Sequence, residues 1–376
     1  MYWGDRMYYL VGTSGYPNYG DELIAAMWLR HLAEVAPDQE VWLDCPSPGQ
    51  AAVLLDGIHP RARFTDTFWR LCWEAPADEP WEVTRWVGHA VHNPGMACRW
   101  VAGIDLAARA DVVHLIGGGY INRIWPRHYG LLAAAVSAVQ RSGGRAVMTG
   151  QGLSPVADHT ASLLRGLVSH FEFADVRDEP SLALIGDATA VGCTGDDMFF
   201  GIGPELYWRS EEPLREVMLC LQSDLLDMPR PELASFVTET LRAWDVTGDR
   251  IGVVEGIPGV DRAIFDLIER DFPGIRFYPF SEIWREGLPA GPGQTWISTR
   301  FHVHLIAAAA GAAGAAVSIN ADYYDNKHRS LTDRGSGWLL VDDLTLPPRP
   351  AGGAFSPEAL RSTWEAKSAL AAKIYT

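Results

Sequence analysis

The sequence has 376 residues, which is longer than one hydrophobic core usually supports, so it predicts two domains. Hydrophobic residues make up 48% of the chain and charged residues 21%, as in soluble globular proteins. The formal net charge of −16 disfavours a nucleic-acid partner, which requires a basic surface, and an anionic substrate would need a local group of cationic side chains.

Cysteine usage and hydropathy indicate a cytoplasmic protein. The five cysteines are scattered and include no Cys-x-x-Cys pair, which is typical of reduced thiols. The first residues lack the basic patch and apolar core of a secretory signal. The longest apolar run, from Val303 to Ile319, is broken by His304 and by glycines, so we expect no membrane span.

Strand-like and helical segments alternate along the first half of the chain, as in open parallel α/β sheets. The first strand is expected at residues 8–11, and a helix at 23–35 has Asp21 and Glu22 favourably placed at its start. The alternation of strand-like and helical segments is repeated in shorter segments at residues 41–43 and 52–55. Further strands are predicted at 112–116, 146–149 and 173–176, and further helices at 129–140 and 160–168.

Glycine, proline and acidic residues gather between residues 196 and 213, which predicts a hinge. A second α/β pattern follows, with strands at 217–221, 251–254, 295–298 and 317–320, helices at 232–243 and 260–271, and a final helix at 356–374. We expect two Rossmann-like doubly wound domains facing a cleft, the GT-B-like architecture. The predicted parts are residues 1–205, 206–350 and 351–376, the last being a helix that could return to the first domain.

The segment from Trp296 to His304 places charge at the entrance of a helix. In an extended backbone Arg300, His302 and His304 would project from one face. The Ala/Gly-rich helix expected after them would present its first amides on the same side as Arg300, where an anion could bind. The alternative is that Arg300 ties down a loop and both histidines are core residues. Five side chains are candidates to form a cationic pocket for an anionic substrate: Arg177, Arg300, Lys327, His328 and Arg329.

Glycine-rich turns follow two predicted strands, at residues 15–20 and 117–119. Both lie at carboxyl ends of strands, where open α/β sheets bind ligands, although turn geometry alone is the alternative. Residues 117–119 do not form a dinucleotide fingerprint, because the second half of that motif is missing. The chain has 15 tryptophans, and five of them crowd into residues 64–101, where they could stack on sugar rings or serve packing or oligomer contacts.

Metal and nucleophile chemistry find little support in the sequence. Asp196 and Asp197 are adjacent rather than spaced as Asp-x-Asp, and His302 and His304 lack a third nearby ligand. No Gly-x-Ser-x-Gly motif or cysteine nucleophile is recognisable. We therefore predict no metal site and no cofactor.

Five separated segments together resemble the polysaccharide pyruvyltransferase family. They are residues 15–24 (GYPNYGDELI), 112–122 (VVHLIGGGYIN), 150–155 (GQGLSP), 176–182 (VRDEPSL) with 194–197 (TGDD), and 298–302 (STRFH) with 324–327 (YDNK). Their order and spacing match the family over most of residues 8–330.

The resemblance implies an enzyme of glycan and cell-envelope biosynthesis. Such an enzyme transfers the pyruvyl unit of phosphoenolpyruvate onto two hydroxyls of a sugar, forms a cyclic ketal and releases phosphate. Phosphoenolpyruvate is then a co-substrate, bound on the side of the second domain, and the saccharide acceptor is bound on the side of the first. The acceptor could be lipid-linked at a membrane surface, and an oligomer is allowed.

The matching motifs carry the family's donor-binding arginines onto Arg177 and Arg300 and its catalytic general acid/base onto His302. Lys327 would add positive charge, and Phe301 replaces the family's usual aliphatic residue. The weaker candidates, for the acceptor or the cleft, are Asn18, Asp21, Gly118, Gly119 and His304.

The implied chemistry suits these residue types. A histidine can act as an acid and then as a base near neutral pH, and guanidinium groups bind phosphate and carboxylate in forked contacts. Two alternatives remain open: a GT-B glycosyltransferase that uses a nucleotide sugar, and a non-catalytic phosphoglycan-binding homologue. The motifs do not identify the acceptor sugar, its carrier, the stereochemistry of the ketal or the oligomeric state.

Overall fold

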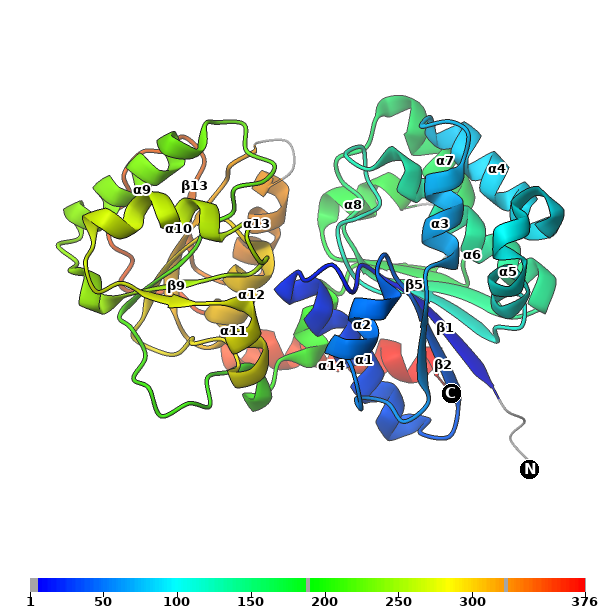
Figure 1. The fold of residues 1–376 in the computed structure, drawn as a ribbon, viewed down its shortest axis with the longest axis horizontal. Coiled ribbons are helices and arrows are strands. Elements are labelled where there is room, and N and C mark those ends of the chain that lie inside the picture. Colours follow the sequence, from blue (N-terminus) through cyan, green and yellow to red (C-terminus); the bar gives the residue numbers. More distant parts are fainter. Residues whose placement is uncertain (1–5, 187–189, 321–323, 376) are drawn as a thin grey trace. The chain divides into compact units, whose positions relative to one another are not determined.

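The computed structural model describes residues 6–186, 190–320 and 324–375, and their contacts divide the chain into two compact units (Figure 1). The first unit is built from the segments up to Tyr16, Asp21–Gly201 and Thr363 onward. The second unit is built from Pro17–Gly20 and Ile202–Ser362.

A parallel sheet forms the centre of the first unit, and within the described residues it has seven strands in the order β3-β2-β1-β4-β5-β6-β7. The strands are β1 (Met7–Val11), β2 (Glu40–Asp44), β3 (Ala62–Thr65), β4 (Val112–Leu115), β5 (Arg145–Gln151), β6 (Phe173–Val176) and β7 (Ala190–Gly192). The strand order reverses between β1 and β4, which pair directly, with Tyr8 opposite Val112. Such a reversal is a topological switch point, where doubly wound sheets bind ligands.

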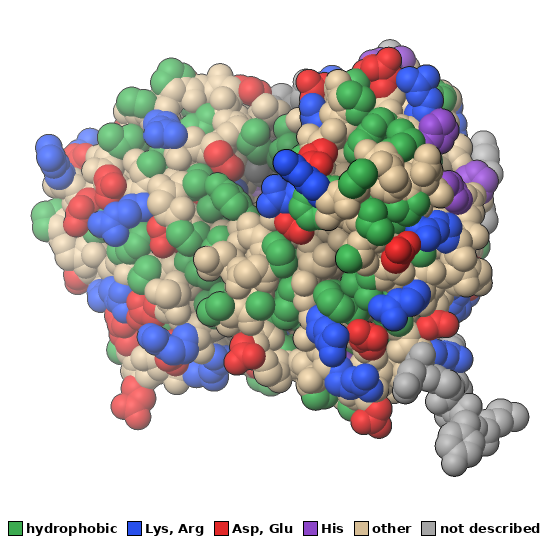
Figure 2. Space-filling view, turned by 45° about the vertical axis from the view of Figure 1, so that its right-hand side comes forward, with side chains coloured by type: hydrophobic (Ala, Val, Ile, Leu, Met, Phe, Trp, Pro, Cys, Tyr) green, Lys and Arg blue, Asp and Glu red, His purple; other side chains and the backbone are tan. Residues whose placement is uncertain are grey.

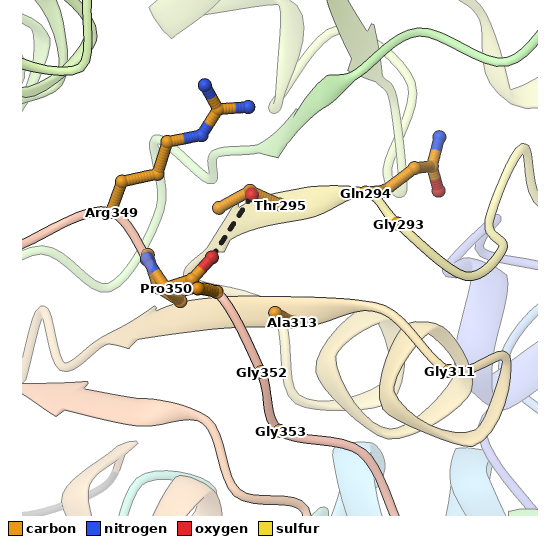
Figure 3. Close-up of a pocket in the computed structure, with 10 residues that line it drawn as sticks. Gly293, Gln294, Thr295, Gly311, Ala313, Arg349, Pro350, Gly352 and Gly353 are labelled. Atoms are coloured by element: carbon orange, nitrogen blue, oxygen red, sulfur yellow. Dashed lines mark hydrogen bonds between the residues drawn. The ribbon is translucent and has the colours of Figure 1, made fainter.

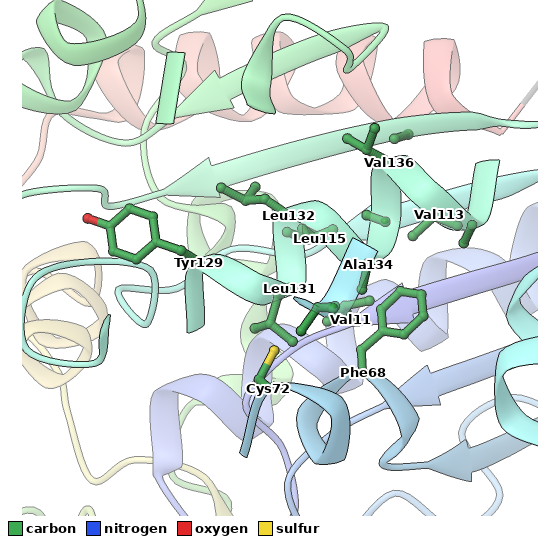
Figure 4. Packing of buried hydrophobic residues seen from close by; sticks show 14 of the residues in the cluster. Val11, Phe68, Cys72, Val113, Leu115, Tyr129, Leu131, Leu132, Ala134 and Val136 are labelled. Carbon is green, nitrogen blue, oxygen red and sulfur yellow. The ribbon is translucent and has the colours of Figure 1, made fainter. Parts of the chain in front are cut away.

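Helices cover both faces of this sheet (Figure 1). They are α1 (Tyr19–Val35), α2 (Pro48–Leu54), α3 (Thr67–Glu74), α4 (Pro80–His92), α5 (Val101–Ala107), α6 (Tyr129–Ser142), α7 (Asp158–Val168) and α8 (Glu179–Ile185). Helices α3 to α8 supply one apolar cluster, in which Phe68, Cys72 and Leu131 meet Val11 and Leu115 of the strands (Figure 4). Each large side chain buried in this way contributes roughly 1.5–3 kcal/mol.

Most of the tryptophans between residues 64 and 101 serve this core. Trp69 is buried and contacts the rings of Tyr120 and His128, and Trp86 and Trp100 pack partly buried against the same cluster. Trp73 and Trp81 remain exposed. The aromatic richness of the segment therefore follows largely from packing.

The second unit contains a parallel sheet whose order, within the described residues, is β10-β9-β8-β11-β12-β13. Its strands are β8 (Val217–Cys220), β9 (Ile251–Val254), β10 (Arg276–Tyr278), β11 (Thr295–Ser298), β12 (Ala313–Val317) and β13 (Leu339–Val341). The helices that follow them are α9 (Arg230–Ala243), α10 (Arg262–Ile268), α11 (Phe280–Glu286), α12 (Phe301–Ala309), α13 (Tyr324–Asp333) and α14 (Pro357–Ile374), the last of which ends in the first unit. The order reverses between β8 and β11, which makes a second switch point.

One strand lies earlier in the chain than the sequence predicts. The Ala/Gly-rich helix expected after His304 is predicted to continue to Val317, with a strand at residues 317–320. Helix α12 instead ends at Ala309, because Gly311 adopts a left-handed backbone with a φ of 90°, and β12 begins at Ala313. Alanine is a strong helix former, so this strand is imposed by tertiary pairing with β11.

A buried ion network joins the last helix to the first sheet. The ammonium of Lys367 donates to Asp175 at 2.6 Å and to Asp197 at 2.8 Å, and all three side chains are at least 98% buried. Asp197 also accepts from Trp28 Nε1 at 2.8 Å and from the Gly117 amide at 2.8 Å. Burial lowers the pKa of the Lys367 ammonium, but the two carboxylates raise it by more, so the pKa lies above its usual value.

On the face shown in Figure 2, basic and acidic side chains are interspersed.

Within the described residues, no helix is long and apolar enough to cross a membrane.

The buried carboxyl of Asp44 makes the stability of the fold depend on pH. It is fully buried and accepts from the Tyr9 hydroxyl at 2.5 Å and from the Phe68 amide at 2.7 Å. Burial raises the pKa of Asp44 to about 8, although both hydrogen bonds act to lower it. The folded state therefore keeps a proton that the unfolded chain releases above about pH 4, and stability is lost as the pH rises from about 4 to about 8.

We expect Asp44→Asn, which keeps the shape of the protonated carboxyl, to flatten this pH dependence. In the wild type the contribution of Asp44 falls by up to about 1.4 kcal/mol per pH unit between about pH 5 and pH 8. Urea denaturation across that range measures the slope, with the exposed Asp56→Asn as a control of unchanged slope. An Asp44→Asn protein whose unfolding free energy falls as steeply as that of the wild type would contradict this account.

Candidate functional site

The main candidate residues of the second unit, Arg300 and His302, follow β11, which pairs with β8 at the switch point of the sheet. Two hydrogen bonds join the loops that leave these strands: the Thr299 amide donates to the Cys220 carbonyl at 3.0 Å, and the Gln222 amide donates to Thr299 Oγ1 at 2.8 Å. Thr299 is fully buried, so the backbone on either side of it is held in place. Arg300 is the next residue along the chain.

The turn from β11 into α12 differs from the extended backbone that the sequence predicts for residues 300–304. Strand β11 ends at Ser298, and Arg300 is the residue that caps α12. Ser298 Oγ accepts from the Arg300 amide at 3.1 Å and donates to the Arg300 carbonyl at 3.0 Å, which closes a tight turn. Because His302 and His304 are helical, they point about 200° apart around α12 rather than to one side.

Arg300 forms a forked ion pair with a buried aspartate. Its Nη2 lies 2.5 Å from Asp261 Oδ1, and its Nε lies 3.2 Å from the same oxygen. Asp261 also accepts from the backbone amides of Gly256, at 2.8 Å, and Ile257, at 3.1 Å. Burial raises the pKa of the Asp261 carboxyl, and the guanidinium of Arg300 acts in the opposite direction. The pair fixes the plane of the guanidinium at the start of α12.

His302 lies against Gly20, which belongs to the same unit. The Tyr19 amide donates to the Gly256 carbonyl at 2.9 Å, which brings residues 17–20 to this edge of the second sheet. A Cβ at position 20 would overlap the imidazole ring of His302, so only glycine fits there. The predicted candidate Asn18 is carried on the same short segment. His302 itself is half-buried, with its ring 5.1 Å from that of Phe301.

His304 is fully buried in a network with His328 and Ser336. The Thr299 carbonyl can only accept, so His328 Nε2, at 3.3 Å, donates to it. In the neutral ring His328 Nδ1 then accepts from His304 Nδ1 at 3.1 Å, and His304 Nε2 accepts from the Ser336 hydroxyl at 2.9 Å. Burial, with a smaller effect from His328, lowers the pKa of His304 well below its usual value.

The ring of His304 also stacks on Trp338 with the ring centres 4.3 Å apart, so its position is fixed by hydrogen bonds and by packing. Lys327 precedes His328 on α13, which packs against α12, and it is largely buried. The motif at residues 324–327 is linked to the residues after β11 through His328, the neighbour of Lys327. The side chains of Tyr324 and Asp325 lie outside the described residues.

In the first unit, Arg177 follows β6 and is 3% exposed. Its Nε lies 3.4 Å from Asp178 Oδ2, and its Nη1 lies 3.7 Å from Asp196 Oδ2. A Cβ at Gly152 would overlap the guanidinium, so that glycine is needed for Arg177 to lie where it does. Arg177 is thus a second buried arginine held by carboxylates at the carboxyl edge of a sheet.

The predicted glycines Gly118 and Gly119 follow β4 at the switch point of the first sheet. The Gly118 carbonyl accepts from the Gly152 amide at 2.8 Å, and the Gly119 carbonyl accepts from Asn122 Nδ2 at 2.8 Å. A Cβ at Gly118 would overlap the ring of Tyr120. Close packing of the turn is therefore sufficient reason for a glycine at position 118.

Asp21 lies in the first turn of α1 and belongs to the first unit. Its neighbour Glu22, which the sequence does not single out as a site residue, is fully buried and accepts from the Ser14 hydroxyl and from the Gly15 amide at 2.7 Å. Burial raises the pKa of Glu22 to about 7.

The second unit therefore contains Arg300, His302, Lys327 and the segment carrying Asn18, and the first unit contains Arg177, Gly118, Gly119 and Asp21. Sequence patterns miss Asp261, because it lies in no recognisable motif and pairs with a residue 39 positions away. In the described part of the chain, no three or more His, Cys, Asp or Glu side chains are grouped as metal ligands would be.

A cavity of about 260 Å³ lies at the other end of the second sheet (Figure 3). Thr295 and Ala313, the first residues of β11 and β12, line it together with Arg349 and Pro350. The Thr295 hydroxyl donates to the Pro350 carbonyl at 3.3 Å. Because this cavity is at the amino ends of the strands, it is separate from the Arg300 site.

Solved structures with the same fold span nearly the whole chain. The UDP-GlcNAc 2-epimerase of Methanocaldococcus jannaschii, in complex with UDP-GlcNAc and UDP, is 11% identical, with 97% of this chain and 99% of that chain covered and a TM-score of 0.53. The UDP-GlcNAc 2-epimerase of Neisseria meningitidis bound to UDP-GlcNAc is 10% identical, with 98% and 93% covered and a TM-score of 0.52.

A ugt transferase of Siraitia grosvenorii in complex with UDP is 12% identical, with 98% of this chain and 92% of that chain covered and a TM-score of 0.50. At these identities the likeness shows the fold alone. Together with the two parallel sheets, it confirms the predicted GT-B-like α/β fold.

A search of curated proteins gives no significant match. The family model described as Polysaccharide pyruvyl transferase matches residues 18–320, which include Asn18, Arg177, Arg300 and His302.

Proposed function

Because the chain belongs to the polysaccharide pyruvyl transferase family, we propose that it transfers the pyruvyl unit of phosphoenolpyruvate onto two hydroxyls of a saccharide, closing a cyclic ketal and releasing phosphate. The observation that carries the proposal is the ordered Arg300 at the start of α12, two residues before His302 and at the switch point of the second sheet. A cation, a helix N-terminus and a proton carrier at one sheet edge suit an anionic donor that must be protonated.

Arg300 binds an anionic group of the donor in this proposal. The N-terminal amides of the nine-residue helix α12 add their partial positive charge beside the guanidinium. Charge-assisted contacts of this kind contribute about 1.5–3 kcal/mol each. Arg177 and Lys327 are proposed to add positive charge for the remaining anionic groups, as their family motifs imply.

His302 is the proposed general acid and base. It donates a proton to the methylene carbon of phosphoenolpyruvate, which leaves cationic character on the central carbon. The first sugar hydroxyl bonds to that carbon and returns its proton to the imidazole. Loss of phosphate then opens the carbon to the second hydroxyl, whose proton leaves with the phosphate, so that one ketal and one phosphate result. Acid–base help of this kind contributes about 10²- to 10⁴-fold.

Calorimetric titration of phosphoenolpyruvate into the wild type and Arg300→Ala tests the donor assignment. We expect saturable binding to the wild type and at least about tenfold weaker binding to the variant, because a charge-assisted contact is lost. Circular dichroism and thermal melting show whether the variant is folded.

UDP- and GDP-sugars, titrated into the same wild-type protein, test the alternative of a nucleotide-sugar glycosyltransferase. That alternative is favoured by the UDP present in structures of the same fold. A wild type that binds a nucleotide sugar but not phosphoenolpyruvate would contradict the proposed function.

A further inference from the structure

Arg300 contacts two carboxylates whose surroundings differ. Its Nη2 lies 2.5 Å from Asp261 Oδ1 and 3.0 Å from Asp224 Oδ1. The side chain of Asp261 is 0% exposed, whereas that of Asp224 is 39% exposed. One guanidinium nitrogen is therefore shared between a buried partner and a partner that water can reach.

Asp261 is fixed in place by its other contacts. Besides its contacts with Arg300, its carboxylate accepts from the backbone amides of Gly256 and Ile257. If the side chain moved away, two buried amides and a buried carboxylate would lose their partners, which is unfavourable. Asp261 is therefore a positioning residue that keeps the guanidinium oriented.

Asp224 lies at the tip of the loop after β8, between two anchored positions. On one side, the Ser223 hydroxyl donates to the Val260 carbonyl at 2.7 Å. On the other, the Asp227 amide donates to the Ile319 carbonyl at 2.9 Å. Between them, Leu225 has a φ of 53°, a left-handed conformation that a branched side chain rarely adopts. Asp224 therefore lies beside a strained backbone position in a loop that is held at both ends.

The charges decide which contact must yield to an anion. Arg300 carries one positive charge, and the two carboxylates that contact it within the described residues carry two negative charges, so these two carboxylates oppose the approach of a phosphate or carboxylate. The repulsion is removed if one carboxylate leaves, and Asp224 is the one that water can reach. Gln222 Nε2, which donates to Asp224 Oδ1 at 3.3 Å, would keep its contact with the Asp224 carbonyl at 3.0 Å.

We propose that Asp224 is a displaceable counter-ion of Arg300. The phosphate or carboxylate of the donor takes its position on Nη2, while Asp261 holds the guanidinium. This inference rests on the proposed function, because it takes the donor to be phosphoenolpyruvate. Asp224 then tunes donor affinity by competing for the same nitrogen.

Calorimetric titration of phosphoenolpyruvate into wild type, Asp224→Asn and Asp227→Asn tests the proposal. We expect Asp224→Asn to bind about fivefold more tightly than the wild type, because a partly exposed competing ion pair is weakened. Asp227→Asn is the control: Asp227 is an exposed aspartate three residues after Asp224, it bonds to Asn320, and its replacement removes the same charge. The affinity of this variant for phosphoenolpyruvate should stay within about twofold of that of the wild type. A gain of affinity in Asp224→Asn alone is a result that structural damage would not produce.

Equal affinities for wild type and Asp224→Asn, weaker binding to Asp224→Asn, or an equal gain in Asp227→Asn would overturn the displacement. If the wild type binds no phosphoenolpyruvate, the proposed function fails, and inorganic phosphate becomes the probe. Tighter phosphate binding to Asp224→Asn that is lost when Arg300→Ala is added would then support the displacement without that function. If wild type and Asp224→Asn then bind inorganic phosphate with equal affinity, the displacement is overturned together with the proposed function.

Discussion

Replacing His302 with asparagine is expected to lower kcat for pyruvyl transfer by about 10²- to 10⁴-fold, because the proposed reaction loses its proton carrier. The KM for phosphoenolpyruvate should change little, since Arg300 and the start of α12 remain to bind the donor. Asparagine is polar and smaller than histidine, so it fits the half-buried site beside Gly20. The measurement is steady-state phosphate release with an accepted saccharide.

His170→Asn is a matched control for this variant, because His170 is exposed and lies in the first unit away from any proposed role. Its kcat should equal that of the wild type. If His302→Asn keeps more than about a tenth of the wild-type kcat, the proton transfer must be assigned to another group.

Replacing Lys367 with methionine is expected to lower the free energy of unfolding by about 3–5 kcal/mol. The change leaves Asp175 and Asp197 buried without their shared cation, and both carboxylates are at least 98% buried. These aspartates also hold backbone amides of the first unit, at Gly150 and Gly117, so the destabilisation should spread through its sheet. Urea denaturation followed by tryptophan fluorescence measures the effect.

Lys373→Met is the control, because Lys373 is an exposed lysine of the same helix α14. We expect a change within about 0.5 kcal/mol for this surface substitution. Unfolding midpoints that are equal for the two variants would contradict the role given to the buried network.

The fold class could be predicted because strand-like apolar runs alternate with helices, and residues 295–298 coincide with β11. Local polar contacts could not be predicted in the same way. Ser298 bonds to the backbone of Arg300 and starts α12 at Phe301, which makes the extended prediction for residues 300–304 wrong. Periodicity alone carries no information about such a cap.

The candidate site was predictable where its residues share a motif and not where they meet across the chain. Arg300 and His302 lie in one short segment that resembles the family. Asp261 and Asp224 lie 39 and 76 positions before Arg300, outside any motif, and only the folded sheet brings them to it. Lys367 is similarly paired with Asp197 from 170 positions away.

The most direct test of the account is the reaction of phosphoenolpyruvate labelled with ¹³C at its central carbon, in the presence of glucose, galactose or mannosamine glycosides. A ketal pyruvyltransferase releases phosphate only with an accepted glycoside, in an amount equal to a new ketal carbon seen by NMR, and we expect Arg300→Ala to abolish both. The contradicting result is that no glycoside yields a ketal, while the same protein transfers sugar from a UDP- or GDP-sugar.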